Sequence, residues 1–191
     1  MAEAPRRLVI SPLTGIPLVG EGDDLAALLV EALARSSLSL QAGDVLVVAQ
    51  KIVSKAEGRV VRLRDVQPSA RAVELAERTD KDPRIVQLIL DESSEIIRAV
   101  PGVLIVRHRL GMIGANAGID QSNVDHRDGE CALLLPVDPD RSAAALRESL
   151  QQRTRKQLGV IISDSNNRPW RLGTLGQAIG SAGIRVLDDR R

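Results

Sequence analysis

Aromatic residues are almost absent from this 191-residue sequence, which contains Trp170 but no phenylalanine and no tyrosine. The core must therefore be built from leucine, isoleucine, valine and alanine. Proteins that hold single-stranded nucleic acid commonly stack the bases on aromatic rings, and this chain lacks such platforms. With 26 basic and 25 acidic side chains it also lacks the basic excess of a phosphate-backbone binder. Nucleic acid is therefore not an expected partner.

Cysteine and long apolar segments are also scarce. Cys131 is the single cysteine, so the sequence excludes an internal disulfide framework and a cysteine-rich zinc site. We expect a buried, inert thiol. Met1 to Arg7 precedes no apolar segment of signal-peptide type, and no stretch approaches the roughly 18 apolar residues of a membrane-spanning helix. These absences predict a cytoplasmic protein without a membrane partner.

The common nucleotide-binding signatures are missing too. The sequence contains neither a Gly-x-x-x-x-Gly-Lys-Ser/Thr loop nor a Gly-x-Gly-x-x-Gly turn. Any nucleotide site in this chain must use another scaffold.

What the sequence does contain is an interleaved pattern of helices and strands. The length permits one large domain or two small intertwined ones, and turn-rich residues 136–140 mark the predicted internal boundary. Glycines 173, 176, 180 and 183 are predicted to share one helical face, and 45–49 to form a strand buried on both faces. The periodicity predicts helices at 23–37, 68–79, 83–90 and 143–150 and strands at 8–10, 45–49, 102–106, 132–135 and 160–162.

A first polar cluster follows the strand predicted at 45–49. Lys51 and Lys55 share a face whether the local backbone is extended or helical, and two ammonium groups aimed together suit phosphate. The alternative interpretation is that both lysines only solvate the end of a strand.

A second cluster is GMIGANAGIDQSNVD, residues 111–125, in which Asn123 follows Asp120 by three positions. Small residues leave the backbone accessible there. A carboxylate suits a hard cation such as Mg²⁺ or Mn²⁺, and the amide can contact a nucleotide. An Asx-rich turn is the alternative.

A third cluster follows the apolar residues 159–162, where Asp164 and Ser165 can jointly hold a metal through carboxylate and hydroxyl oxygens. Arg168 and Arg171 can bind phosphate or carboxylate, or form salt bridges around Trp170. We discount two other metal candidates, the group His126, Asp128 and Glu130 and the lone His108, because alternating polar residues entering a strand more simply form its solvated face.

Several separated motifs together resemble one family. GIPLVGEGDDLA, QKIVSKAEGR, ANAGIDQSNVD, LLLPVDPD and SDSNNRPWRLGTLGQAIGSAGI are similar to segments of the coenzyme F(420)-0:L-glutamate ligase family. They occur in the family's order and approximate spacing, from about Gly15 to the C-terminus. The resemblance implies an α+β fold of mixed sheets with flanking helices, in an intertwined homodimer.

The same resemblance implies a GTP-dependent ligase that joins L-glutamate to the lactyl carboxylate of a deazaflavin phosphodiester, with Mg²⁺ or Mn²⁺ and with K⁺. By matching position, Asp120 and Asp164 are metal ligands with catalytic roles, and Ser165 stands where the family commonly has a threonine ligand. The predicted GTP-contacting residues are Ile16, Pro17, Leu18, Val19, Gln50, the catalytic Lys55, and Asn123.

Two departures from the family pattern affect these expectations. Serine in place of threonine at 165 keeps the hydroxyl, so coordination is expected to persist. The sequence ends at Arg191, whereas family members continue into a segment with further nucleotide contacts and a glutamine metal ligand. The alternatives are therefore an impaired GTP- and metal-binding fragment, a regulatory protein, or a ligase of the same fold acting on another carboxylate.

Overall fold

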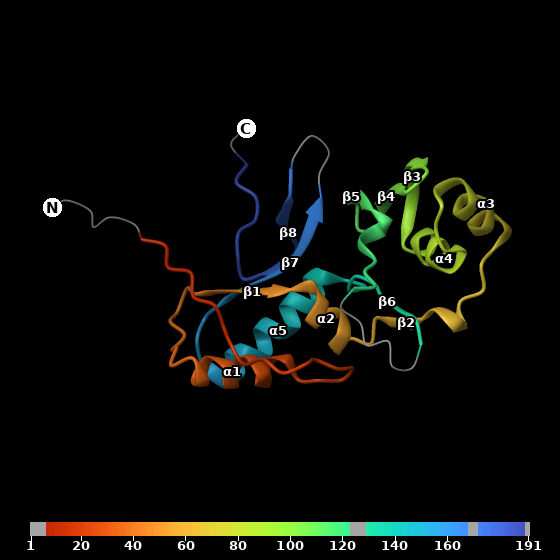
Figure 1. Cartoon of the computed structure of the whole chain (residues 1–191). Helices are drawn as coiled ribbons and strands as arrows, with labels where there is room; N and C mark the ends of the chain where they lie inside the picture. The colour runs from red at the N-terminus through yellow and green to blue at the C-terminus, as the bar shows by residue number, and fades with distance from the viewer. Residues whose placement is uncertain (1–6, 123–128, 168–171, 190–191) are drawn as a thin grey trace.

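A computed structural model of the chain describes residues 7–122, 129–167 and 172–189 (Figure 1). Helices and small sheets are interleaved in it, which confirms the predicted α+β class with mixed sheets and flanking helices. Within the described ranges, no helix combines the length and the apolar character needed to cross a bilayer.

One part of the chain is built around a three-stranded sheet in the order β1-β7-β8. Strands β1 (Val45–Ala49) and β7 (Gly159–Asn167) are parallel, whereas β8 (Thr174–Ala182) runs antiparallel to β7. The helices α1 (Leu25–Arg35), α2 (Gln50–Ala56) and α5 (Pro139–Thr154) lie together on one side of this sheet (Figure 1). Their buried residues form what we call the α1–α5 core, which includes Leu29, Val48, Leu150 and Ile162.

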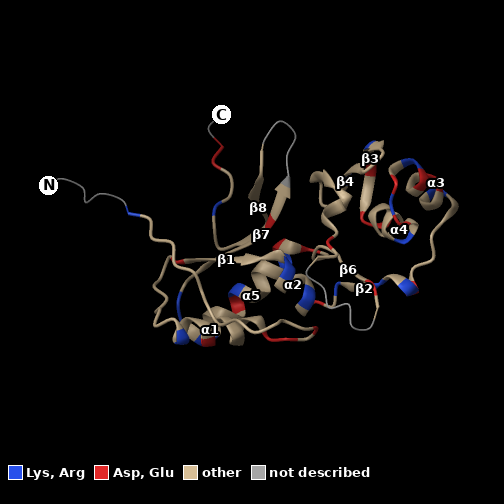
Figure 2. Ribbon diagram, in the orientation of Figure 1, with Lys and Arg blue, Asp and Glu red and all other residues tan. Residues whose placement is uncertain are grey.

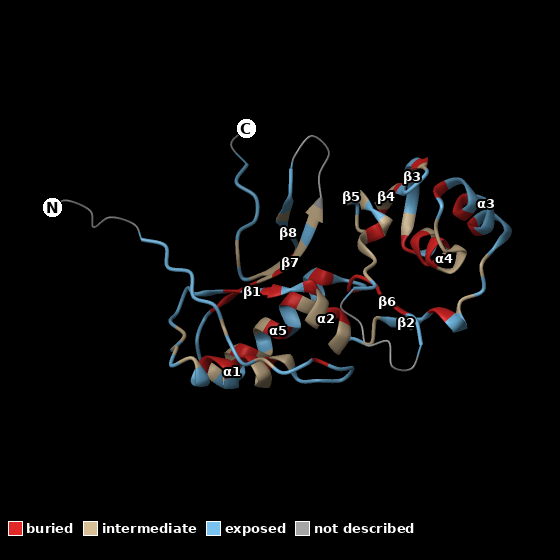
Figure 3. Ribbon diagram, viewed as in Figure 1, coloured by how far each residue is buried: buried red, intermediate tan, exposed pale blue. Residues whose placement is uncertain are grey.

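The other part holds the helices α3 (Ala70–Thr79) and α4 (Pro83–Asp91). They pack on a sheet of β3 (Ser93–Val100), β4 (Val103–His108) and β5 (Ile113–Ala115), which is followed by the 3₁₀ turn η2 (Asn116–Gly118). The buried residues form the α3–α4 core, with Ile89, Leu104 and Val106 at its centre. Figure 3 shows buried residues concentrated in these two regions.

Two chain crossings connect the parts. The chain leaves α2 into β2 (Val60–Arg62) and the 3₁₀ turn η1 (Leu63–Asp65), and it returns after β6 (Cys131–Leu133), which pairs antiparallel with β2. The return runs through residues 134–138 into α5. The internal boundary near 136–140 lies on this return and stays a prediction. Cys131 is buried, as expected.

The helix boundaries follow from capping chemistry. Asp24 accepts a hydrogen bond from Ala27 N–H at 2.9 Å and so begins α1. Asp82 and Asp138 cap α4 and α5 in the same way, and a proline occupies the first turn of each. The helices predicted at 23–37, 68–79 and 83–90 are confirmed, and the one at 143–150 is the middle of a longer helix.

Three local predictions were wrong. Residues 8–10 form no strand, because they find no neighbouring strand and their side chains are exposed. Strand β1 is buried on one face only, since helices cover a single side of its sheet and Val45 and Val47 remain exposed. The glycines of 173–183 lie in and beside strand β8 rather than on a helix. Gly180 is needed there because an added Cβ would lie 2.3 Å from the Pro139 carbonyl oxygen.

Candidate functional site

The carboxyl ends of the parallel strands β1 and β7 meet at one edge of the sheet, with Ala49 opposite Ser163. Helix α2 begins directly after β1, so Gln50 and Lys51 lie next to Asp164 on the neighbouring strand. In open α/β sheets ligands bind outside the carboxyl ends of parallel strands. The polar cluster predicted to follow strand 160–162 lies inside the longer strand β7.

The opposite wall comes from the segment after β5. Asn116, Ala117 and Gly118 all have positive φ angles, of 53°, 53° and 69°. For the non-glycine residues this conformation costs roughly 1–2 kcal/mol each. A Cβ at Gly118 would lie 3.0 Å from the Leu135 side chain, so the backbone approaches that residue closely. The strained backbone of this turn positions Asp120 next to the ends of β1 and β7.

Between the two walls lies a cavity of about 300 Å³. That volume is near the lower end of ligand pockets, which span about 300–1,000 Å³. Its charged lining consists of two carboxylates and one ammonium group. The lining residues are Ala49, Gln50, Lys51, Ala115, Gly118, Ile119, Asp120, Ser163, Asp164, Ser165 and Asn166.

Asp120 is held by backbone and side chain at once. Its N–H donates to the Leu133 carbonyl at 3.0 Å, and its own carbonyl accepts from Leu133 N–H at 2.8 Å. Its Oδ1 accepts from Ser122 N–H at 2.9 Å and from Ser122 Oγ at 2.7 Å. Oδ2 contacts the Lys51 ammonium. The Asx turn that was the alternative interpretation is therefore present, but it engages one oxygen while the other faces a cation.

Asp164 carries the second carboxylate. Burial raises the pKa of this carboxyl above its ordinary value, and the negative charge of Asp120 raises it further. A hydrogen bond from Ser165 N–H at 2.8 Å, another from the Gln50 side chain, and the charge of Lys51 lower the pKa without cancelling the rise. The ionised form of Asp164 is therefore less well stabilised at this position than it would be in water.

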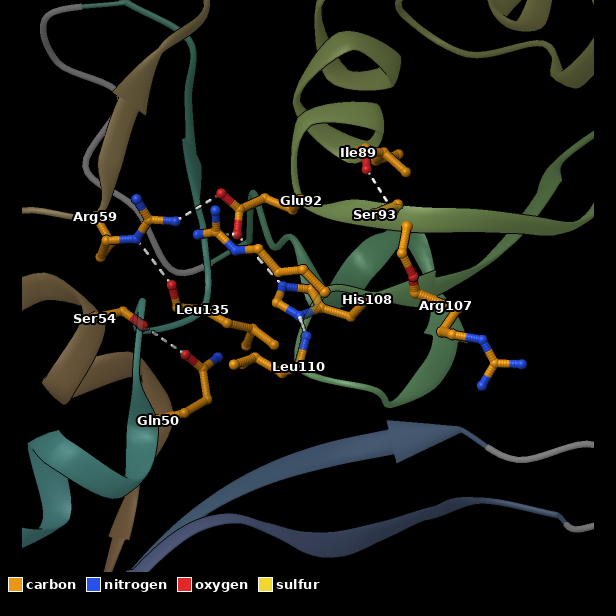
Figure 4. Close-up of polar contacts among 12 residues, drawn as sticks. Gln50, Ser54, Arg59, Ile89, Glu92, Ser93, Arg107, His108, Leu110 and Leu135 are labelled. Carbon is orange, nitrogen blue, oxygen red and sulfur yellow. Dashed lines mark hydrogen bonds and ion pairs between the residues drawn. The ribbon is translucent and has the colours of Figure 1, made fainter.

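Gln50 connects helix α2 to this carboxylate. Its side chain is buried, and its Oε1 accepts from Ser54 Oγ at 2.9 Å, one turn along the helix (Figure 4). Because that bond fixes the amide orientation, the NH₂ group is left to serve Asp164.

A divalent metal fits this donor set. In the described residues no group of three or more His, Cys, Asp and Glu side chains occurs, so a site closed by protein ligands alone is not indicated there. Mg²⁺ is usually held by one or two carboxylates together with phosphate oxygens and waters. Asp120, Asp164 and Ser165 line one cavity and carry carboxylate and hydroxyl oxygens of the kind that such an incomplete shell uses.

The other predicted site residues lie elsewhere or outside the described ranges. Lys55 is one helical turn beyond Lys51 and is not in the cavity lining. The loop of Ile16, Pro17, Leu18 and Val19 leads to the far end of α2, where Gly22 N–H donates to Ala56 at 2.9 Å. Val19 is buried and Leu18 is 95% exposed. Asn123, His126, Asp128, Arg168, Trp170 and Arg171 lie outside the described residues.

A second charged cluster was not predicted from the sequence. Glu92, at the end of α4, is buried and meets Arg59 Nη2 at 2.9 Å through Oε1 (Figure 4). Arg109 pairs with Oε2 at 2.9 Å, and His108 Nε2 lies 3.4 Å from the same oxygen. We call these four residues the Glu92 cluster. Its members come from three separated segments, so no motif reveals it.

The Glu92 cluster links the segment after α2, the end of α4 and the end of β4. Arg59 Nε donates to the Leu135 carbonyl at 2.9 Å, and His108 Nδ1 accepts from Leu110 N–H at 3.0 Å. Burial acts to raise the pKa of Glu92, but the contact with His108, the hydrogen bond from Arg59 and the positive charges of Arg59 and Arg109 outweigh it, so the pKa lies below its ordinary value. His108 is buried in this cluster rather than on a solvated strand face, and its exclusion as a metal ligand stays a prediction. Glu130 is bound to Arg84 instead.

Basic and acidic residues are interspersed along the ribbon in both parts of the chain (Figure 2). At the cavity, Lys51 of α2 pairs with Asp120 of the segment after η2, and its charge also acts on Asp164 of β7. Lys51 and Asp164 come from one part of the chain and Asp120 from the other, so groups of both signs meet where the two parts join.

Comparison with known proteins identifies the family to which the chain belongs. The model of the family described as F420-0:Gamma-glutamyl ligase matches residues 15–191. The chain is 49% identical over 177 residues to the coenzyme F420:L-glutamate ligase of Methanothermobacter thermautotrophicus, covering 93% of this chain and 69% of that protein. It is 46% identical over 184 residues to that of Methanopyrus kandleri and 45% identical over 184 residues to that of Archaeoglobus fulgidus, covering 96% of this chain and 70% of each relative. The chain therefore belongs to the F420-0:gamma-glutamyl ligase family.

Proposed function

We propose that this chain is a GTP-dependent ligase that forms an amide between L-glutamate and the lactyl carboxylate of coenzyme F420-0, in coenzyme F420 biosynthesis. Membership of the family and the names of its relatives support the ligase class and the glutamate substrate. The observation that carries the proposal is the cavity in which Asp120 and Asp164 face Lys51.

The reaction requires activation because a carboxylate is a poor electrophile. The γ-phosphoryl group moves from GTP to a carboxylate oxygen, which releases GDP and forms an acyl phosphate. The glutamate amine then attacks the carbonyl carbon, the C–N bond forms, and the C–O bond to phosphate breaks as the nitrogen loses a proton. No covalent bond to the protein is needed, so the chain's task is positioning and charge stabilisation.

Each residue has a role in this proposal. Asp120, Asp164 and Ser165 would hold Mg²⁺ or Mn²⁺, which when bound neutralises phosphate charge and orients the phosphoryl group. Gln50 keeps the Asp164 carboxylate oriented. Lys55 would counter the charge of the moving phosphoryl group.

The remaining parts of the proposal rest on the family resemblance. Residues 16–19 and Asn123 would contact the guanine nucleotide, K⁺ would assist, and two chains would form an intertwined homodimer.

Product analysis tests the proposal. The chain is incubated with GTP, L-glutamate, coenzyme F420-0 and Mn²⁺, and the deazaflavin is examined by mass spectrometry together with GDP release. We expect a mass increase of one glutamyl group that depends on GTP. GDP-coupled amide formation on a different carboxylate alone would keep the ligase class and overturn the substrate. Absence of any coupled product would overturn the function.

A further inference from the structure

The carboxylate of Asp120 has two oxygens with different partners. Oδ1 accepts both hydrogen bonds from Ser122, and Oδ2 contacts the ammonium group of Lys51. The side chains of Lys51 and Asp120 are 36% and 22% exposed, so the pair lies at the open part of the cavity. Of the two carboxylate oxygens, Oδ2 is therefore the one that contacts a positive charge.

We propose that Lys51 is a built-in counter-ion for the metal site, which occupies Asp120 while the divalent cation is absent and leaves that carboxylate when the cation binds. This inference rests on the proposed function, because it presupposes a metal at Asp120 and Asp164. A cation on Oδ2 would lie within a few ångströms of the ammonium group, where two positive charges repel strongly in a partly buried site. The two cations therefore compete for one position.

The chain around Lys51 permits the exchange. Ser122 holds the Asp120 carboxylate through Oδ1, so its orientation does not depend on Lys51 alone. A lysine side chain is a flexible four-carbon stem with a compact charge, and Lys51 projects from the first turn of α2 into the lining of the same cavity. Once released, its ammonium can turn to an anion in that cavity, such as a triphosphate. Metal binding and phosphate binding are then coupled through one side chain.

The competition also accounts for the charges of the cavity. The two carboxylates and one ammonium group of the lining leave an excess of one negative charge. With a divalent cation added, the same lining carries an excess positive charge, which favours a phosphate ligand. Without metal, Lys51 thus keeps the net charge of the cavity lining close to zero. When a divalent cation neutralises the carboxylates instead, the Lys51 ammonium is free to bind an anion.

Mn²⁺ titration by calorimetry tests the exchange with the metal alone as probe. We compare wild type with Lys51→Met, which keeps the stem and removes the charge, with Lys51→Arg, which keeps a cation, and with Lys156→Met as a matched control. Lys156 is exposed at the end of α5 and is not in the cavity lining. We expect Lys51→Met to bind Mn²⁺ about tenfold more tightly, a difference of about 1.4 kcal/mol. Lys51→Arg should not bind more tightly than wild type, and Lys156→Met should match it.

Unchanged or weaker Mn²⁺ binding by Lys51→Met would overturn the proposal, because Lys51 would then be either irrelevant to the metal or a support for its ligands. If wild type itself binds no Mn²⁺, the metal site of the proposed function fails as well, so the two failures are distinguishable.

Thermal unfolding gives a second readout. Lys51→Met should unfold at a lower temperature than wild type without metal and gain more than wild type from saturating Mn²⁺. An equal loss with and without Mn²⁺ would indicate a structural role only and would also overturn the proposal.

Discussion

The Glu92 cluster and the cavity at Asp164 are both partly buried and charged, yet they treat their carboxylates in opposite ways. Around Glu92, two guanidinium groups and an imidazole surround one carboxylate, and its pKa is lowered. Around Asp164, burial and a second carboxylate dominate over one ammonium group, and its pKa is raised. The Glu92 carboxylate is surrounded by an excess of positive charge, whereas the cavity carboxylates exceed the one ammonium group beside them.

The difference separates stability from function. A buried carboxylate whose charge is fully matched is costly to remove, because its partners are left unpaired in a low-dielectric surrounding. A carboxylate whose charge is not matched weakens the folded state and is retained where it binds something. The Glu92 cluster thus joins separate segments of the fold, whereas we propose that Asp120 and Asp164 bind a cation.

Glu92→Gln is expected to have the largest effect on stability. It removes the negative charge that Arg59, Arg109 and His108 share, and breaking a buried ion pair typically costs about 3–5 kcal/mol. We expect the free energy of unfolding, measured in urea, to fall by about 3 kcal/mol. Glu95→Gln is the control, since the exposed pair of Glu95 with Arg107 should contribute less than about 1 kcal/mol. Equal losses in the two variants would remove the contrast between the clusters.

Asp164→Asn should weaken metal binding without lowering the stability of the metal-free chain. The substitution removes an anionic oxygen from the proposed cation site, so we expect Mn²⁺ affinity to fall at least about tenfold, equivalent to about 1.4 kcal/mol. The free energy of unfolding of the metal-free chain should stay the same or rise, because an uncompensated carboxylate is gone. Calorimetry and urea unfolding measure the two quantities on the same preparation. A loss of stability like that of Glu92→Gln would show that Asp164 is structural.

The pH dependence of stability tests the sign of the Glu92 shift. The folded pKa is lowered from the ordinary 4.5, so the stabilisation is fully present above pH 4.5 and is lost as the pH falls through the folded pKa. Over an accessible acid range only part of it disappears. We therefore expect the stability difference between wild type and Glu92→Gln to be constant from pH 7 to about pH 5 and to shrink below 4.5. A difference that grows on acidification would contradict the assignment.

The smallest effect concerns the two lysines of α2. We expect Lys55→Ala to weaken GTP binding more than Lys51→Ala does, because the family resemblance assigns only Lys55 to a fixed phosphate contact. Fluorescent nucleotide titration in the presence of Mn²⁺ measures both. Equal losses would indicate a general electrostatic patch over α2 rather than a defined phosphate contact.

Local chemistry made part of this structure predictable. Helix α1 was found because Asp24 caps a clear apolar period, and the candidate ligands Asp120 and Asp164 were found because polar residues interrupt apolar segments. The exposed face of β1 was missed, since a β-branched run does not reveal how many sides are covered.

The remaining misses depend on contacts between distant segments. The glycines near β8 repeat at a helical interval but serve a strand that lies against Pro139. Arg59, Glu92 and His108 are far apart in the sequence, and only the folded chain brings them together. The predicted positions of the nucleotide loop, Lys55 and Asn123 stay predictions.

Anomalous diffraction from crystals grown with Mn²⁺ tests most directly whether the cavity lined by Asp120 and Asp164 is a metal site. We expect a manganese peak within about 2.5 Å of a carboxylate oxygen of both Asp120 and Asp164, with the Ser165 hydroxyl beside it. The Lys51 ammonium should no longer contact Asp120 in that crystal. A manganese peak at other residues, with Lys51 still bound to Asp120, would contradict both the metal site and the exchange.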